Sequence, residues 1–229
     1  MPAGFAPPPL LRPGLFLVPR RIIHPEFQLS RSSLSKIEGA IPDFPALPLL
    51  EEKEKVLFDA IRTGGRLGIG YDLSKGRLPR SPDGIMQMKK KKADCDELSL
   101  LFISALKQLL EKRNKGTETR SDQNRIVFDP ERYAAVLVVF RIKGKLIGHL
   151  PIFRKTDDTL LDLTRTNPQN LSGPPTKETL EFYEEEIVSV TIFDNINAFA
   201  AAHYREKGAY YGERVTIGWH WRLSRRHIY

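Results

Sequence analysis

The sequence predicts an α+β fold, in which helices come first and a run of antiparallel strands follows. Apolar residues at helical spacing follow residue 51, and a second, stronger helical pattern begins at Asp94. Three apolar segments then lie between residues 134 and 164, separated by short polar turns. Helices and strands that occur in separate runs, rather than in alternation, are typical of α+β domains. A chain of 229 residues is long enough for one such domain with an additional segment.

Composition excludes several classes of protein. Hydrophobic residues make up 41% of the chain and charged residues 28%, which excludes a wholly disordered protein. No apolar run approaches the roughly 18–20 residues of a membrane span, and prolines interrupt the N-terminal segment where a signal peptide would be apolar. We therefore expect a cytoplasmic protein with no membrane contact. Cys95 is the only cysteine, which excludes an internal disulfide and a zinc site built from several cysteines.

The net charge of +8 is concentrated in one part of the chain. Residues 49–92 carry +5 of it and end in the lysine run 89–92. Such a run is usually a solvated face; the alternatives are a contact with an acidic substrate and an electrostatic effect on the nearby cysteine. Because no motif of stacking aromatic residues accompanies the lysines, we do not expect nucleic acid as a partner.

The first segment, residues 1–48, holds 10 of the 17 prolines. Prolines interrupt helices and lack the hydrogen-bond donor that a central strand needs, so we predict an extended arm. A helix is predicted from residue 51, where acidic residues suit a helix N-terminus, and the glycine pair 64–65 is expected to end it. The glycine-rich stretch 65–84 is predicted to be loop.

A strong helix is predicted over residues 94–112. Asp94 is a favourable N-cap, and Glu97, three positions later, completes a pattern typical of a capping box. A continuous apolar stripe then runs from Leu98 to Leu109. We therefore expect this helix to pack on the hydrophobic core.

Three strands are predicted after this helix, over residues 134–142, 146–153 and 160–164. The first is apolar enough to be a central strand that is covered on both faces. The polar turns at 143–145 and 154–159 are expected to join the three strands into an antiparallel meander.

Cys95 is a candidate nucleophile because it lies in the first turn of the predicted helix, where a thiolate is stabilised. A lone cysteine is, however, more often a buried apolar residue. A cysteine nucleophile needs an imidazole and a third group that orients the ring. His149 lies in the second predicted strand, where a core histidine is the alternative. If the following turn is centred on residues 155–156, Asp162 is its cross-strand neighbour, and a slip of one residue would separate the two.

These residues lie in segments that resemble the transglutaminase-like cysteine domains, a circularly permuted relative of the papain fold. ADCDELSLLF is similar to the family's cysteine helix, GHLPIF to its histidine strand and LLDLT to its aspartate strand, and VLFDAIRTGGRLGIGYD is similar to the element before the cysteine. The resemblance covers roughly residues 51–165. The chain departs from the family at Ala93, which replaces a glycine, and at Leu150-Pro151, where the family has an aromatic companion of the histidine.

The resemblance implies an antiparallel sheet packed on the cysteine-bearing helix, and a cysteine peptidase or amidase. Cys95 would attack an amide carbonyl of a protein or peptide substrate, His149 would protonate the departing amine, and Asp162 would orient His149. Hydrolysis is favoured over crosslinking, and no metal or cofactor is expected. For the oxyanion, the backbone N–H of Cys95 is a candidate donor, with a side chain near Tyr71 as a second. The alternative is an inactive member of the family that acts as a binding or scaffold protein through its C-terminal helices.

Residues 171–229 are expected to form a helical extension beyond a domain that spans residues 49–170. Helices are predicted over residues 178–202 and 213–223, after a boundary loop. The segment from residue 195 onward resembles one tetratricopeptide unit, which implies a helical hairpin and a protein partner that binds to it. A plain helical extension is the alternative, because repeat arrays normally need about three units.

Overall fold

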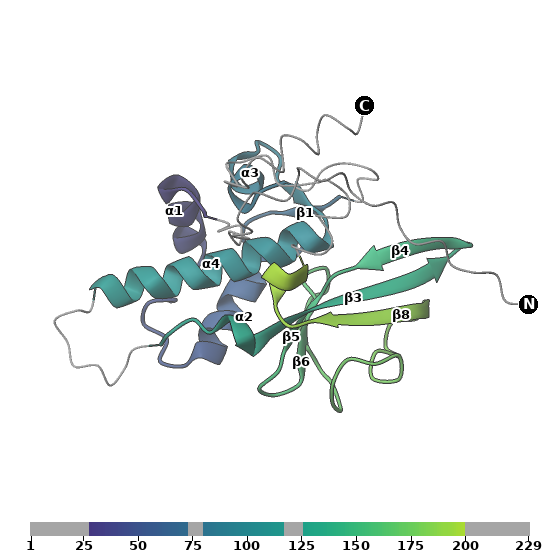
Figure 1. The fold of residues 1–229 in the computed structure, drawn as a ribbon. Coiled ribbons are helices and arrows are strands. Elements are labelled where there is room, and N and C mark those ends of the chain that lie inside the picture. The colour runs from purple at the N-terminus through teal and green to yellow at the C-terminus, as the bar shows by residue number, and fades with distance from the viewer. Residues whose placement is uncertain (1–27, 73–79, 117–125, 200–229) are drawn as a thin grey trace, which may run out of the picture.

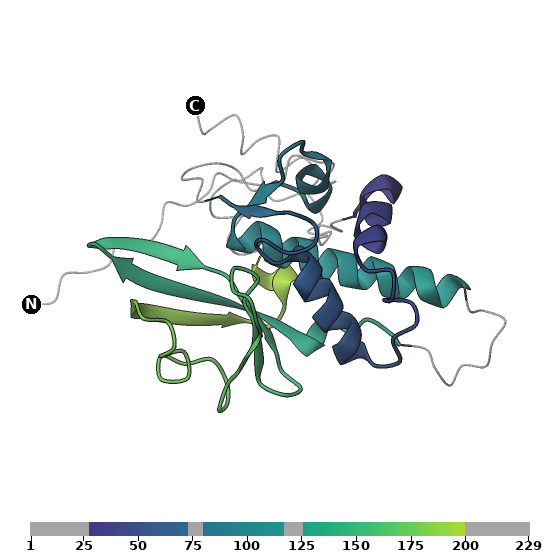
Figure 2. The same cartoon turned by 180° about the vertical axis from the view of Figure 1, so that it is seen from behind.

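The structure, a computed structural model, describes residues 28–72, 80–116 and 126–199. Figures 1 and 2 show a twisted sheet on one side of the molecule, with the long helix α4 between that sheet and the shorter helices α1 and α3. The combination of helices with an antiparallel sheet confirms the predicted α+β class. No helix in these three ranges is both long and apolar enough to cross a membrane.

Most of the helices precede the sheet in the chain. Their bounds are Arg31–Ala40 for α1, Leu50–Ile61 for α2, Pro82–Gln87 for α3 and Cys95–Gly116 for α4. α2 and α4 confirm the two predicted helices, although α2 ends at Ile61, before the glycine pair that was expected to end it. Leu98, Leu101 and Phe102 of α4 are fully buried, as the apolar stripe requires.

Helix α1 corrects the prediction of an extended arm over residues 1–48. Its ten residues contain no proline, and the side chain of Ser30 caps it by accepting from the N–H of Ser33. Ile37, Ile41 and Phe44 are buried in the core. Counting prolines over the whole segment concealed this proline-free stretch, while residues 1–27 lie outside the described residues.

The predicted loop at residues 65–84 also contains regular structure. Gly70–Tyr71 forms strand β1, which pairs in parallel with β2 (Lys92–Ala93). Helix α3 begins at Pro82, where Ser81 caps it by accepting from the N–H of Gly84. Residues 73–79 lie outside the described part of the chain. The short β1–β2 pair brings residue 71 beside the segment that leads into α4.

Strand β3 lies at the centre of the main sheet, as predicted. β4 and β5 lie along one edge of it and β8 along the other. β6 pairs with β5, and β7 with β6, all antiparallel, which confirms the predicted meander. The strand predicted over residues 146–153 is, however, divided into β4 and β5 at residues 150–151. The bounds are Tyr133–Ile142 for β3, Lys145–His149 for β4, Ile152–Arg154 for β5, Thr159–Leu161 for β6, Gln169–Asn170 for β7 and Glu186–Phe193 for β8.

Strand β8 shows that the helix predicted over residues 178–202 is wrong. Of residues 178–199, only 196–199 are helical, and β8 pairs with most of β3. The acidic run before β8 is typical of a helix start, but the sequence EIVSVTIF is rich in β-branched residues, which favour a strand. The sheet therefore extends past residue 170, the predicted domain boundary. The predicted helix at 213–223 and most of the tetratricopeptide-like segment lie outside the described residues.

Two hydrophobic clusters cover the two faces of the sheet. The larger contains the buried residues of α2 and α4 together with Ala135, Ile152 and Leu161. The smaller contains Val136, Val138 and Phe140 of β3 and is closed by side chains from the segment before β8, Leu180 and Tyr183. The segment that was assigned to a separate extension is therefore part of the core.

Candidate active site

Cys95 is the first residue of α4, and a capping box fixes the backbone around it. The Asp94 carboxylate Oδ1 accepts from the N–H of Glu97 at 3.3 Å, and Glu97 Oε2 accepts from the N–H of Asp94 at 3.1 Å. The reciprocal pair confirms the predicted box. Cys95 itself is half-buried and not in a disulfide. The helix N-terminus thus presents this thiol in a fixed position, with the positive end of the helix dipole behind it.

Glu97 also ties this helix start to the preceding segment. Its carboxylate is fully buried and accepts from Arg80 at three points: the backbone N–H at 2.6 Å, Nε at 3.0 Å and Nη2 at 2.7 Å. A bidentate guanidinium–carboxylate contact is strong and directional. Arg80 was not among the predicted site residues, because its partner is 17 positions away and no local pattern connects the two.

Asp94 and Asp96 flank the cysteine in sequence. Burial, together with a hydrogen bond to Asp96, raises the pKa of Asp94 to about 9. Around neutral pH Asp94 therefore keeps its proton and places less negative charge beside Cys95 than an ionised carboxylate would.

His149 ends strand β4, and its ring is bonded to Asp162. Nε2 lies 2.8 Å from Oδ2 of Asp162, and both side chains are buried. The rings of Phe140 and Tyr183 pack on the imidazole at centroid distances of 6.2 and 5.8 Å. Burial opposes protonation of the ring, but hydrogen bonds to Asp162 and Cys95 outweigh it and raise the pKa of His149 to about 10.

The pairing register differs from the predicted one. Ile152 pairs with Leu161 and Arg154 with Thr159, so that Asp162 continues the ladder opposite Pro151 instead of His149. The turn closes one residue later than expected, at Asp158, which has a φ of 51°. This moves Asp162 two residues along the ladder. Because side chains alternate between the faces of a sheet, a shift of two keeps His149 and Asp162 on the same face, as diagonal neighbours.

Asp162 is surrounded by donors. Oδ1 accepts from the N–H and the hydroxyl of Thr164, at 3.0 and 2.7 Å, and Oδ2 accepts from the Tyr183 hydroxyl at 2.7 Å in addition to His149. Arg165 Nε lies 3.6 Å from the same oxygen. Burial alone would favour the neutral acid, but the hydrogen bonds hold the pKa of Asp162 well below its usual range. A buried, ionised carboxylate of this kind can orient an imidazole and stabilise its protonated form.

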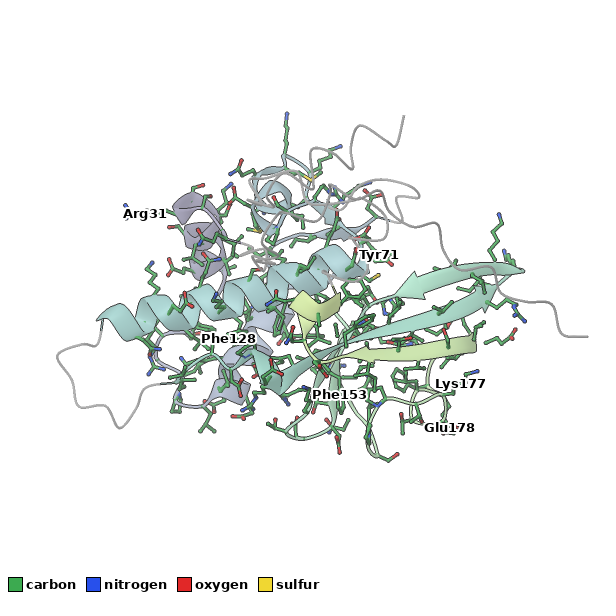
Figure 3. The ribbon with its side chains drawn as sticks, viewed as in Figure 1. Arg31, Tyr71, Phe128, Phe153, Lys177 and Glu178 are labelled. Atoms are coloured by element: carbon green, nitrogen blue, oxygen red, sulfur yellow. The ribbon has the colours of Figure 1, made fainter. Side chains whose placement is uncertain are left out.

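Cys95 influences the titration of both His149 and Tyr71. It raises the pKa of each, and for Tyr71 burial is the larger cause. Because Asp162 occupies Nε2 of His149, Nδ1 is the ring nitrogen left for the sulfur. Tyr71 is placed by the β1–β2 pair, in which it lies beside Ala93. Figure 3 shows Tyr71 at the N-terminal end of α4.

Helix α4 is also fixed directly to the histidine strand. One turn into the helix, the Ser99 hydroxyl donates to the backbone carbonyl of Leu150 at 2.6 Å, and both groups are buried. The carbonyl belongs to the residue after His149. This bond sets the helix start against the end of β4. The structure therefore bonds the predicted residues His149 and Asp162 to each other and fixes the helix start that carries Cys95 against the strand that carries His149.

Besides Arg80, the site residues Thr164 and Tyr183 were not predicted from the sequence. Thr164 lies two positions after Asp162, a spacing at which a side-chain oxygen commonly accepts from the backbone, so a local signal for it existed. Tyr183 lies 21 positions away in the segment assigned to a helix, and no local signal pointed to it. In the described part of the chain, no group of three His, Cys, Asp or Glu side chains is arranged to hold a metal ion.

Comparisons with protein-family models, curated proteins and solved structures find no match for this chain.

Proposed function

We propose that this protein is a cysteine-dependent acyl-transfer enzyme acting on amide or peptide bonds, and that its fold is transglutaminase-like. The observation that carries the proposal is the connected series of side chains from Cys95 through His149 to Asp162. Nucleophile, base and orienting carboxylate come from the start of α4, the end of β4 and the residue after β6, in the order that the resemblance implies. A thiol paired with an imidazole, which is oriented in turn by a third group, is the arrangement that nucleophilic catalysis requires.

In the first step, the Cys95 thiolate attacks the carbonyl carbon of the substrate. A bond from sulfur to carbon forms while the carbonyl oxygen takes up negative charge. The backbone N–H of Cys95 and the Tyr71 hydroxyl are the donors proposed for that oxygen. The pKa of Tyr71 is raised by burial and by the charge of Cys95, so the hydroxyl stays protonated and can donate. His149 then gives its proton to the amine nitrogen as the carbon–nitrogen bond breaks.

In the second step, the acyl group leaves the enzyme. Neutral His149 takes a proton from water, the resulting hydroxide attacks the thioester carbon, and the carbon–sulfur bond breaks to restore the thiolate–imidazolium pair. An amine in place of water would give crosslinking. We favour hydrolysis because water needs no second binding site. Asp162, ionised throughout, keeps His149 oriented and stabilises its protonated form.

Acylation of Cys95 by p-nitrophenyl acetate tests this proposal. Intact-mass spectrometry should detect one acetyl group on the wild-type chain, lost in Cys95→Ala, with a burst of nitrophenol. His149→Ala should slow the burst by about 100-fold or more, as expected for loss of a general base. Tyr133→Phe, which alters a buried tyrosine bonded to Glu54 instead of to the site, is the matched control. If Cys95 is acetylated as fast in His149→Ala as in the wild type, the proposal of an acyl-transfer enzyme is wrong, and the alternative of a non-catalytic binding protein is favoured.

A further inference from the structure

Tyr183 and His149 share one oxygen atom of Asp162. The Tyr183 hydroxyl donates to Oδ2 at 2.7 Å, and Nε2 of His149 lies 2.8 Å from the same atom. The other oxygen, Oδ1, accepts from the N–H and the hydroxyl of Thr164. Tyr183 therefore competes with the imidazole for the same acceptor, whereas Thr164 does not.

The Tyr183 ring is held on several sides. It packs on Phe140 at a centroid distance of 5.0 Å and meets the imidazole of His149 edge-on at 5.8 Å. The guanidinium of Arg165 lies 4.6 Å from its centroid, a cation–π contact. Only 6% of Tyr183 is exposed. The packing of the ring therefore fixes the Tyr183 hydroxyl at Oδ2 of Asp162.

We propose that Tyr183 is a fourth member of the site, a positioning residue that takes part of the Oδ2 atom of Asp162 and so limits how strongly Asp162 holds the proton on His149. The inference rests on the proposed function, because only an acyl-transfer site needs that proton to leave. The other charged or titratable groups around the pair are Cys95 of α4, Tyr71 of β1 and Arg165 after β6.

The physical reason is the distribution of charge on the carboxylate. A hydrogen bond to a carboxylate stabilises its charged form and makes its oxygen a weaker acceptor for other donors. Tyr183→Phe keeps the ring and its packing but removes the hydroxyl, so His149 no longer shares Oδ2 with a second hydrogen-bond donor. Because Thr164 and Arg165 still keep Asp162 ionised, its carboxylate then stabilises the protonated imidazole of His149 more strongly than in the wild type. His149 becomes a better partner for the thiolate and a poorer proton donor to the amine.

Loss of the Tyr183 hydroxyl and disordering of the site should shift the pH dependence of Cys95 alkylation in opposite directions. In Tyr183→Phe the acid limb of the rate of Cys95 alkylation by iodoacetamide should move to lower pH by about half a unit, so that alkylation below the midpoint is about 3-fold faster. Disordering of the site would instead weaken the contact of Asp162 with His149 and move the limb to higher pH.

Tyr133 provides a matched control. It is also buried, with 2% exposed, and its hydroxyl donates to the carboxylate of Glu54. Tyr133 lies at the far end of β3, five residues from Val138, the partner of His149, which corresponds to roughly 16 Å along a strand. Tyr133→Phe removes a comparable buried hydrogen bond and should leave the alkylation profile of Cys95 unchanged.

The experiment measures iodoacetamide alkylation from pH 4 to 9 in the wild type, Tyr183→Phe, Tyr133→Phe and Asp162→Asn, with thermal unfolding of each. A shift to lower pH in Tyr183→Phe alone supports the inference. A profile that coincides with that of the wild type, or that moves to higher pH as in Asp162→Asn, overturns it.

NMR titration of the His149 imidazole separates this inference from the proposed function. If Tyr183 limits the hold of Asp162 on the proton, the ring titrates at higher pH in Tyr183→Phe than in the wild type, and an equal or lower value contradicts the inference. If Cys95 in the wild type reacts no faster than a free thiol, the proposed function is contradicted. The titration of His149 in Tyr183→Phe would still show whether Tyr183 weakens the hold of Asp162 on the imidazole proton.

Discussion

Asp162 is almost fully buried and yet ionised, and the reason lies in its hydrogen bonds. Thr164, Tyr183 and His149 all bond to its two oxygens, and their combined effect exceeds the cost of burial. His149 depends on this charge in turn, because burial alone would keep the ring neutral. At the scale of single residues, the protonation states in the site are therefore coupled: the hydrogen bonds keep Asp162 ionised, and the charge of Asp162 keeps His149 protonated.

Asp162→Asn tests this coupling. Loss of the carboxylate charge should lower the pKa of His149 from about 10 by roughly one unit or more, measured by NMR titration of the imidazole. An imidazole that titrates at the same pH in Asp162→Asn as in the wild type would contradict the coupling.

The same shift makes stability depend on pH. The pKa of His149 is higher in the folded chain than its ordinary 6.5, so its contribution to the free energy of unfolding is complete below about pH 6.5. That contribution is lost as the pH rises through about 10. Urea unfolding between pH 6 and 10 should therefore show a decline in the wild type that is shallower in Asp162→Asn.

At the scale of elements, helix α4 carries the cysteine, and its first turn is held by Glu97. This carboxylate bonds to the backbone of Asp94 and to Arg80, so one side chain fixes both the cap and the segment that precedes the helix. The cap itself was predictable, because Asp94 and Glu97 have the spacing of a capping box and are followed by an apolar stripe. The role of Arg80 was not, because it depends on tertiary contact.

Glu97→Ala tests the importance of this contact. Because the carboxylate is fully buried and paired, its removal should lower the free energy of unfolding by about 3–5 kcal/mol. Glu111→Ala on the same helix is the control: Glu111 is half exposed and lies 3.9 Å from Lys107, and its loss should cost less than about 0.5 kcal/mol. Equal effects in urea unfolding would show that Glu97 does not hold the helix start.

At the scale of the whole molecule, β8 belongs to the same sheet as β3, although the sequence analysis assigned the two segments to different domains. Strands 134–142 and 160–164 could be predicted because their apolar runs and turns are local patterns. The sheet position of β8 could not, because an acidic run followed by β-branched residues is compatible with a helix start or a strand until β3 supplies the partner. The same contact places Tyr183 beside Asp162 and explains why the sequence did not reveal its role.

A chain that ends at residue 170 tests the extent of the domain. It would lack β8 and expose one edge of β3, together with the cluster around Val136 and Val138 that Leu180 and Tyr183 cover. We expect no cooperative thermal transition by far-ultraviolet circular dichroism. A chain that ends at residue 199 retains these contacts and should melt cooperatively. If both chains melt alike, the domain ends at residue 170 after all.

The most direct test of the central claim is the rate of alkylation of Cys95 by iodoacetamide at pH 6, in the wild type and in His149→Ala. Because His149 is bonded to Asp162 and its pKa is raised in part by Cys95, the wild-type thiol should react well below pH 8 and faster than free cysteine, and His149→Ala should abolish most of that advantage. A wild-type rate equal to that of free cysteine, unchanged in His149→Ala, would contradict an active Cys95–His149–Asp162 group.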